Sequence, residues 1–290
     1  MKLNPSFFKN YSLFTLVFVL LAIFWGAWVR LSFSGDGCGS SWPLCEDKIF
    51  PENVKALIEW LHRLSSGLAL CFVFILFAMA FKIYPKNHGV RAFSTASFVL
   101  ILISALIGAV LVLSGLVGAN TDKVRVLVLA VHSVNSLLLV GALTLCYKMS
   151  LWKKRGEKIT DILKVKKPMI YFVSLFPLLA LTGNIASLAG QLFPSLSLSS
   201  ALALDLLPSA HISLKIRPLH PLLAVSFLLG LSFFAFSKKH LLAPALAVLA
   251  VVLFGFATLV FLSPLWMKIT HLVLAYVLWI FLLDFSIQKL

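Results

Sequence analysis

The sequence predicts an all-α integral membrane protein with eight transmembrane helices, arranged as two pseudo-symmetric four-helix bundles. Three observations support this fold class. Of the 290 residues, 61% are hydrophobic and 12% are charged, whereas soluble domains are about 45–50% apolar and about 25% charged. Eight apolar stretches are long enough to cross about 30 Å of hydrocarbon. One histidine recurs near the start of every second stretch. The composition excludes a soluble enzyme, a disordered chain and a small disulfide-stapled domain.

Each apolar stretch holds about 20 predominantly apolar residues, which is the length that a membrane-spanning helix needs. The first is span-length with no small-residue cleavage site after it, so we expect a retained helix rather than a signal peptide. The chain is expected to consist of an N-terminal bundle (1–150), a basic linker (151–167) and a C-terminal bundle (168–290). The predicted spans are 11–31, 56–81, 92–118, 125–147, 168–190, 216–236, 241–263 and 266–287.

The net charge of +15 indicates the orientation of the chain. With the N-terminus in the cytoplasm, 16 of the 25 Lys and Arg residues and only 3 of the 10 acidic residues fall on the cytoplasmic side. Cytoplasmic loops of membrane proteins are enriched in Lys and Arg. We therefore expect a multi-pass protein of the cell membrane with both termini cytoplasmic. The basic residues are spread over loops, which argues against a nucleic-acid partner.

Each even-numbered span carries one histidine within about two helical turns of its outer end, so all four lie at similar depth. A single intramembrane histidine is about as often a hydrogen-bonding residue between helices as a functional one. Four at matched depth, two in each half, favour function. The remaining histidines, His88, His211 and His240, do not fit this pattern and receive no role. The four candidates are His62, His132, His220 and His271.

Two imidazoles on facing helices suit the two axial positions of a haem, whose other ligands come from the porphyrin. Zinc usually needs three or four protein ligands, and a di-metal site needs several carboxylates. The sequence therefore predicts two haem sites, one in each half. The haem propionates would favour cations at the outer ends, where Arg63 and Arg217 lie, with help from Arg30 and Arg125. Ordinary interfacial snorkelling is an equally good account of these arginines.

Glu59 precedes His62 by three residues, which puts both side chains on one face of a helix. If the site is functional, Glu59 handles protons or positions a water beside a bound haem substrate. Its alternative role is an acid at a helix start, favoured by the macrodipole. The corresponding position in the second half is Arg217, so the two haem sites are expected to differ.

The first outer loop carries Cys38 and Cys45, seven residues apart. In an oxidising compartment such a pair forms a disulfide, although the spacing also allows a redox-active pair. Cys71 and Cys146 lie within spans and are expected to be small core residues.

These motifs resemble those of the haem A synthase family, over nearly the whole chain. The most specific part is Trp42-Pro43-Leu44-Cys45 followed by Glu59 and His62-Arg63. The sequence departs from the family at Pro221, where an arginine usually follows the histidine. Further matches are the loop from Ser34 to Cys45, Phe50-Pro51, Gly108-Ala109-Val110, His132, Thr182-Gly183 to Phe193-Pro194, and His271-Leu272 with Ala275.

The resemblance implies a membrane oxidoreductase that oxidises the C8 methyl of haem O to a formyl group, giving haem A for terminal oxidases. Its N-terminal half would hold haem O with His62, His132 and Glu59, and its C-terminal half a haem b with His220 and His271. Cys38 and Cys45 would match the loop cysteines of one subclass. The implied partners are haem O, membrane lipid, an electron acceptor of open identity, and a haem O synthase.

Two other functions remain open from the sequence. A di-haem cytochrome that only transfers electrons would need the four histidines but not Glu59. A haem transporter or assembly factor with an internal repeat would fit the eight spans, and it would be colourless when purified without its cargo.

Overall fold

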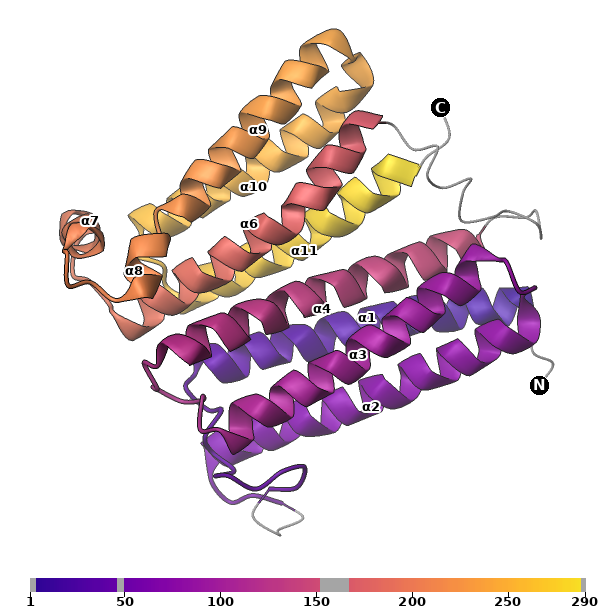
Figure 1. Ribbon diagram of the computed structural model, residues 1–290, viewed down its shortest axis with the longest axis horizontal. Helices are drawn as coiled ribbons and strands as arrows, with labels where there is room; N and C mark the ends of the chain where they lie inside the picture. Colours follow the sequence, from indigo (N-terminus) through magenta and orange to yellow (C-terminus); the bar gives the residue numbers. More distant parts are fainter. Residues whose placement is uncertain (1–3, 46–49, 152–166, 288–290) are drawn as a thin grey trace. The chain divides into compact units, whose positions relative to one another are not determined.

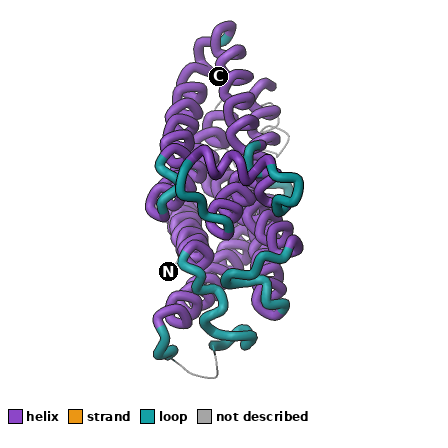
Figure 2. The backbone as a smooth tube through the Cα atoms, turned by 90° about the vertical axis from the view of Figure 1, so that its left-hand side faces the viewer, coloured by secondary structure: helices purple, strands orange, loops and turns teal. Residues whose placement is uncertain are grey.

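The computed structural model describes residues 4–45, 50–151 and 167–287 (Figure 1). Every regular element in these ranges is a helix, as Figure 2 shows. Eight helical segments are long and apolar enough to cross a membrane, so the predicted all-α membrane class is confirmed. The basic residues of the linker at 152–166, on which much of the predicted orientation depends, lie outside the described residues.

The long helices exceed the predicted spans at several ends because polar residues extend them beyond the hydrocarbon. α1 begins at Pro5, six residues before the predicted start, where the Asn4 side chain accepts from the N–H of Phe7 at 2.8 Å. Such caps satisfy orphan donors at helix starts. The long helices are α1 Pro5–Leu31, α2 Val54–Ile83, α3 Gly89–Leu113, α4 Lys123–Ser150, α6 Lys167–Leu192, α9 Leu219–Ser237, α10 Leu242–Val260 and α11 Leu265–Ile287.

Two predicted spans extend past the end of their helices. α3 ends at Leu113 rather than at residue 118, because Gly115 and Gly118 adopt positive φ and turn the chain. α10 ends at Val260, before Leu262 and Ser263, which also have positive φ. The described part of the chain also contains three shorter helices: α7 Leu198–Leu206, α8 Ile212–Ile216 and the 3₁₀ turn η1 Lys239–Leu241.

The chain forms two compact units. The first contains residues 1–120, 135–165 and 287–290, and the second contains residues 121–134 and 166–286. The first turns of α4, with His132, therefore group with the helices that follow the linker. The predicted domain boundaries and pseudo-symmetry stay predictions.

Polar side chains join helices inside each unit, while large apolar side chains cover the outside. In the first unit the Asn135 amide on α4 donates to the Leu100 carbonyl at 2.8 Å and to the Ser104 hydroxyl at 2.7 Å, both on α3. In the second, Asn184 donates to the Ser133 hydroxyl. Such bonds are typical of membrane helix pairs. Phe236, 90% exposed, illustrates an outer surface suited to lipid rather than to water.

Candidate functional site

The four predicted histidines lie at similar positions in their spans. Each follows the first residue of its span by six to nine residues, when α8 and α9 are taken as the single span Ile212–Ser237. The matched depth in the membrane that the sequence predicts stays a prediction. The histidines are His62 on α2, His132 on α4, His220 on α9 and His271 on α11.

His220 and His271 lie close together in the second unit. Their ring centres are 6.3 Å apart and their planes are inclined by 77°. A metal–imidazole bond of about 2 Å, with about 1 Å more from each nitrogen to its ring centre, would separate two trans imidazoles by about 6 Å. The observed separation thus fits two axial ligands of one iron.

The surroundings of these two rings leave ligand nitrogens available. Nδ1 of His220 lies 3.3 Å from the Thr182 hydroxyl on α6, which engages one of its two nitrogens. Nδ1 of His271 is buried and has no hydrogen-bond partner among the described residues. Phe254 on α10 is nearly parallel to the His271 ring, at 13° and 6.3 Å between centres. Apolar walls and an unsatisfied imidazole nitrogen fit a haem better than a purely structural histidine pair.

His62 and His132 belong to different units, so their predicted pairing stays a prediction. The His62 ring packs against Gly26 of α1, and its Nδ1 lies 3.5 Å from the Ser66 hydroxyl. His132 is half-buried on α4. The described residues contain no group of three or more His, Cys, Asp and Glu side chains that could hold a metal ion.

Glu59 is buried near the start of α2, with 3% of the residue exposed. Its Oε2 accepts the backbone N–H of Cys38 at 2.9 Å, and its Oε1 accepts from Arg63 Nη2 at 2.7 Å. The carboxylate therefore joins the helix to the loop between α1 and α2, and its predicted roles stay predictions. A buried, hydrogen-bonded carboxylate of this kind can serve as a proton acceptor.

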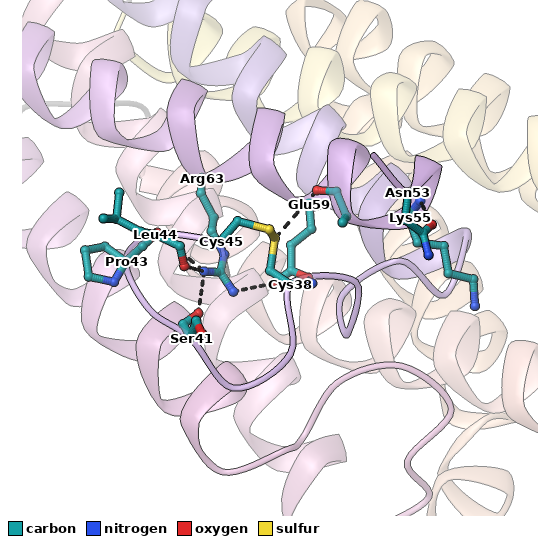
Figure 3. The surroundings of a disulfide bond; sticks show 10 residues. Cys38, Ser41, Pro43, Leu44, Cys45, Asn53, Lys55, Glu59 and Arg63 are labelled. Carbon is teal, nitrogen blue, oxygen red and sulfur yellow. Dashed lines mark hydrogen bonds and ion pairs between the residues drawn. A yellow bond between two sulfur atoms is a disulfide. The ribbon is translucent and has the colours of Figure 1, made fainter. Parts of the chain in front are cut away.

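Arg63 links Glu59 to the loop between α1 and α2, as Figure 3 shows. Its Nη1 donates to the carbonyls of Ser41 and Leu44, the latter at 2.7 Å. Its Nε is buried and lacks a hydrogen-bond partner among the described residues. The guanidinium group thus faces protein acceptors, with one N–H remaining for a further acceptor such as a propionate.

Cys38 and Cys45 form a disulfide, which the sequence had left open against a free redox pair. Both cysteines are buried and pack against Ala56 and Trp60 of α2. Gly37 brings the loop onto the helix: a Cβ there would lie 2.5 Å from the backbone nitrogen of Ala56. The bridged loop is consequently fixed directly over the helix that carries Glu59 and His62.

Arg217 has an acidic partner that the sequence interpretation missed. Its Nε donates to Asp205 Oδ2 at 3.0 Å, its Nη2 lies 2.8 Å from Oδ1, and Nη2 also donates to the Ala201 carbonyl at 2.7 Å. Asp205 is at the end of α7, whose start is closed by a capping box between Ser197 and Ser200. The Ser-x-x-Ser pattern is a helix-start signal, but it does not predict that Asp205 pairs with Arg217.

The two accessory arginines lie near helix ends. Arg30 is in the last turn of α1, and Arg125 is buried at 2% exposure in the first turn of α4. Their predicted contribution to propionate binding stays a prediction.

Several known proteins are similar to this chain. The chain is 36% identical over 276 residues to a Thermus thermophilus protein named protoheme IX farnesyltransferase, covering 90% of this chain and 45% of that protein. It is 32% identical over 167 residues to a heme A synthase of Alkalihalophilus pseudofirmus, covering 57% of this chain and 53% of that protein. A Bacillus cereus heme A synthase is 32% identical over 198 residues, covering 65% and 61%.

The chain therefore spans about half the length of the curated relatives it matches. The pattern of the COX15-CtaA family, described as cytochrome oxidase assembly protein, matches residues 9–283. That range includes all eight membrane-spanning helices in whole or in part, the disulfide loop and the four histidines. The chain belongs to the COX15-CtaA family of cytochrome oxidase assembly proteins.

Proposed function

We propose that the protein is a haem A synthase, a membrane oxidoreductase that converts the C8 methyl of haem O to a formyl group. The observation that carries the proposal is the 6.3 Å separation of the His220 and His271 rings in a chain whose relatives include proteins named heme A synthase. The haem A would serve terminal oxidases, which suits membership of an oxidase assembly family.

The two units have different proposed roles. His220 and His271 would be the axial ligands of a resident haem b, with Arg217 near its propionates. His62 and His132 would bind the substrate haem O, with Arg63 near its propionates. When bound, haem b would supply one-electron redox chemistry. The unequal surroundings, with Glu59 only on the His62 side, support one reacting site and one electron-relay site.

Glu59 is the proposed proton acceptor. Replacing hydrogen on a methyl carbon by oxygen from water releases protons as well as electrons, so a base near the substrate is required. The Cys38 N–H and Arg63 hold one carboxylate oxygen each, at 2.9 and 2.7 Å. These two donors fix the orientation of the carboxylate, and the disulfide loop covers it from bulk water.

The farnesyltransferase name of the Thermus relative bears on the supply of substrate. The match covers 45% of that protein, so more than half of it has no counterpart in this chain. We therefore do not assign farnesyl transfer to this chain. An enzyme that farnesylates protohaem makes the substrate proposed here, and we propose such a haem O synthase as a partner, beside membrane lipid and an electron acceptor.

Production of haem A in cells tests the function. Co-expression with a source of haem O, followed by chromatography of the extracted pigments, should give haem A. The His220→Ala and His271→Ala variants should lose the bis-histidine spectrum of the purified protein, whereas His240→Ala, a change outside the pattern, should retain it. Extracts that contain haem O but no haem A would exclude the synthase and leave the di-haem cytochrome. A colourless wild-type protein would favour a transporter or assembly factor.

The proposed location is the cell membrane with both termini in the cytoplasm. Charge asymmetry supports this orientation, and the long helices are suited to lipid. A reporter that is active only in the cytoplasm, fused after Leu290, should be active. The same reporter inserted after Leu196, in the loop before α7, should be silent.

A further inference from the structure

Three of the four histidine rings approach a glycine on the preceding long helix closely. A Cβ built on Gly26 of α1 would be 2.6 Å from Cε1 of His62. The corresponding distance is 2.8 Å from Gly183 of α6 to Cε1 of His220, and 2.9 Å from Gly255 of α10 to Cε1 of His271. Carbon atoms in contact are normally about 3.5–4.0 Å apart. No residue other than glycine fits these positions with the rings where they are.

Close approach to a ring is found at these three helical glycines, whereas Gly89, the first residue of α3, would meet the flexible end of Met149 at 2.5 Å. Gly67 of α2, Gly108 of α3 and Gly190 of α6 would meet nothing within 4 Å, and Gly230 of α9 would meet Phe172 at an ordinary 3.5 Å. Glycine is the poorest helix former after proline. Its presence inside three helices, directly under three imidazoles, therefore indicates a positional requirement.

The residue before each of these glycines contacts the histidine-bearing helix. Thr182, before Gly183, places its hydroxyl 3.3 Å from His220 Nδ1. Phe254, before Gly255, lies parallel to the His271 ring. Trp25, before Gly26, donates its indole N–H to the Ile58 carbonyl of α2 at 3.0 Å, one turn before His62. Each pair thus combines a close backbone approach with a side chain that aligns the helices.

We propose that Gly26, Gly183 and Gly255 are positioning residues that set the depth and rotamer of His62, His220 and His271 for axial haem ligation. The glycine removes the Cβ that would displace the ring, and the preceding residue fixes the neighbouring helix or the ring itself. This inference rests on the proposed function, because it assigns the three rings their ligand role.

The test uses Gly→Ala variants of the full chain, with control variants at helical glycines that face no histidine. Gly183→Ala should lower haem per polypeptide several-fold and alter the low-spin spectrum, whereas Gly190→Ala should leave both at wild-type values. Gly26→Ala and Gly67→Ala form the same comparison for α1 and α2. Gly183→Ala and Gly255→Ala proteins with wild-type haem content, spectrum and midpoint potential would overturn the inference.

A double-mutant cycle separates this inference from the proposed function. In protein from haem-depleted cells, Gly183→Ala should lower the thermal unfolding midpoint, but not in the His220→Ala background, where no imidazole remains to be displaced. Equal lowering in both backgrounds would overturn the positioning role. If instead His220→Ala and His271→Ala proteins keep the haem spectrum, the proposed haem b site fails whatever the glycine cycle shows.

Discussion

The backbone N–H of Cys38 donates a 2.9 Å hydrogen bond to the carboxylate of Glu59. One cysteine of the disulfide in the loop between α1 and α2 is thereby joined to the buried acid of a membrane helix. The conformation of the loop and the position of the Glu59 carboxylate, the proposed proton acceptor, therefore depend on each other.

Replacing Glu59 with glutamine should lower the rate of haem A formation by about 10²-fold or more, the usual contribution of a positioned acid or base. The amide keeps the size of the side chain but cannot accept a proton from the substrate. Haem A formation relative to bound haem O would be measured in membranes. Glu52→Gln, a change at an exposed loop position, is the control. Full activity of Glu59→Gln would remove Glu59 from the mechanism.

Removing the disulfide should loosen the support of Glu59. The bridge closes a short loop with a sequence separation of 7, and chain entropy gives about 2–3 kcal/mol for a loop of this size. The Cys38→Ser/Cys45→Ser protein should unfold at a lower temperature, and reductant should have the same effect on wild type. The Cys71→Ser variant, which changes a free and exposed cysteine, should unfold at the wild-type temperature. A reductant-insensitive midpoint in wild type would contradict this account.

Asp205→Ala should be more damaging than the loss of both members of its ion pair. Only 4% of the Asp205 side chain and 13% of the Arg217 side chain are exposed, so the single change leaves a mostly buried guanidinium without its carboxylate. Breaking a buried pair in this way costs about 3–5 kcal/mol. The thermal midpoint should fall less in Asp205→Leu/Arg217→Met than in Asp205→Ala. A thermal midpoint that falls at least as far in the double variant as in Asp205→Ala would show that the two side chains are not coupled in this way.

Asn135→Ala should weaken the packing of α4 on α3. The amide makes two hydrogen bonds to α3, and such bonds between membrane helices contribute about 0.6 to 2 kcal/mol. The variant should show a small decrease in stability in detergent, with no change in haem spectrum. The stability and haem spectrum of Ser136→Ala, a change at the next residue of α4, are measured for comparison. A changed haem spectrum in Asn135→Ala would contradict this prediction, because it would show that the contact affects the haem sites.

The spans, the histidines and the disulfide could be predicted because their signals are local. An apolar stretch identifies a span, and the repeat of His220 and His271 at similar depth requires only helix geometry. Helix ends were less predictable, because Gly115 and Gly118 leave the helix through backbone conformations that hydropathy does not report.

Partners distant in the sequence could not be predicted. Arg63 contacts Ser41 and Leu44, and Arg217 contacts Asp205, through loops whose paths no periodicity specifies. The glycines beside the histidines could not be singled out from the sequence, because glycine is common in membrane helices. Only the packing shows which imidazole each one faces.

The grouping of residues 121–134 with the second unit has a consequence for biosynthesis. Val126 and Ala130 of α4 form one buried cluster with Ile185 and Leu188 of α6. A ribosome completes α4 before α6 emerges. The apolar face at the start of α4 is therefore not covered by α6 until α6 has been synthesised. A fragment that begins at residue 167 would lack this surface. A fragment that begins at residue 121 should therefore be more stable on its own than one that begins at residue 167.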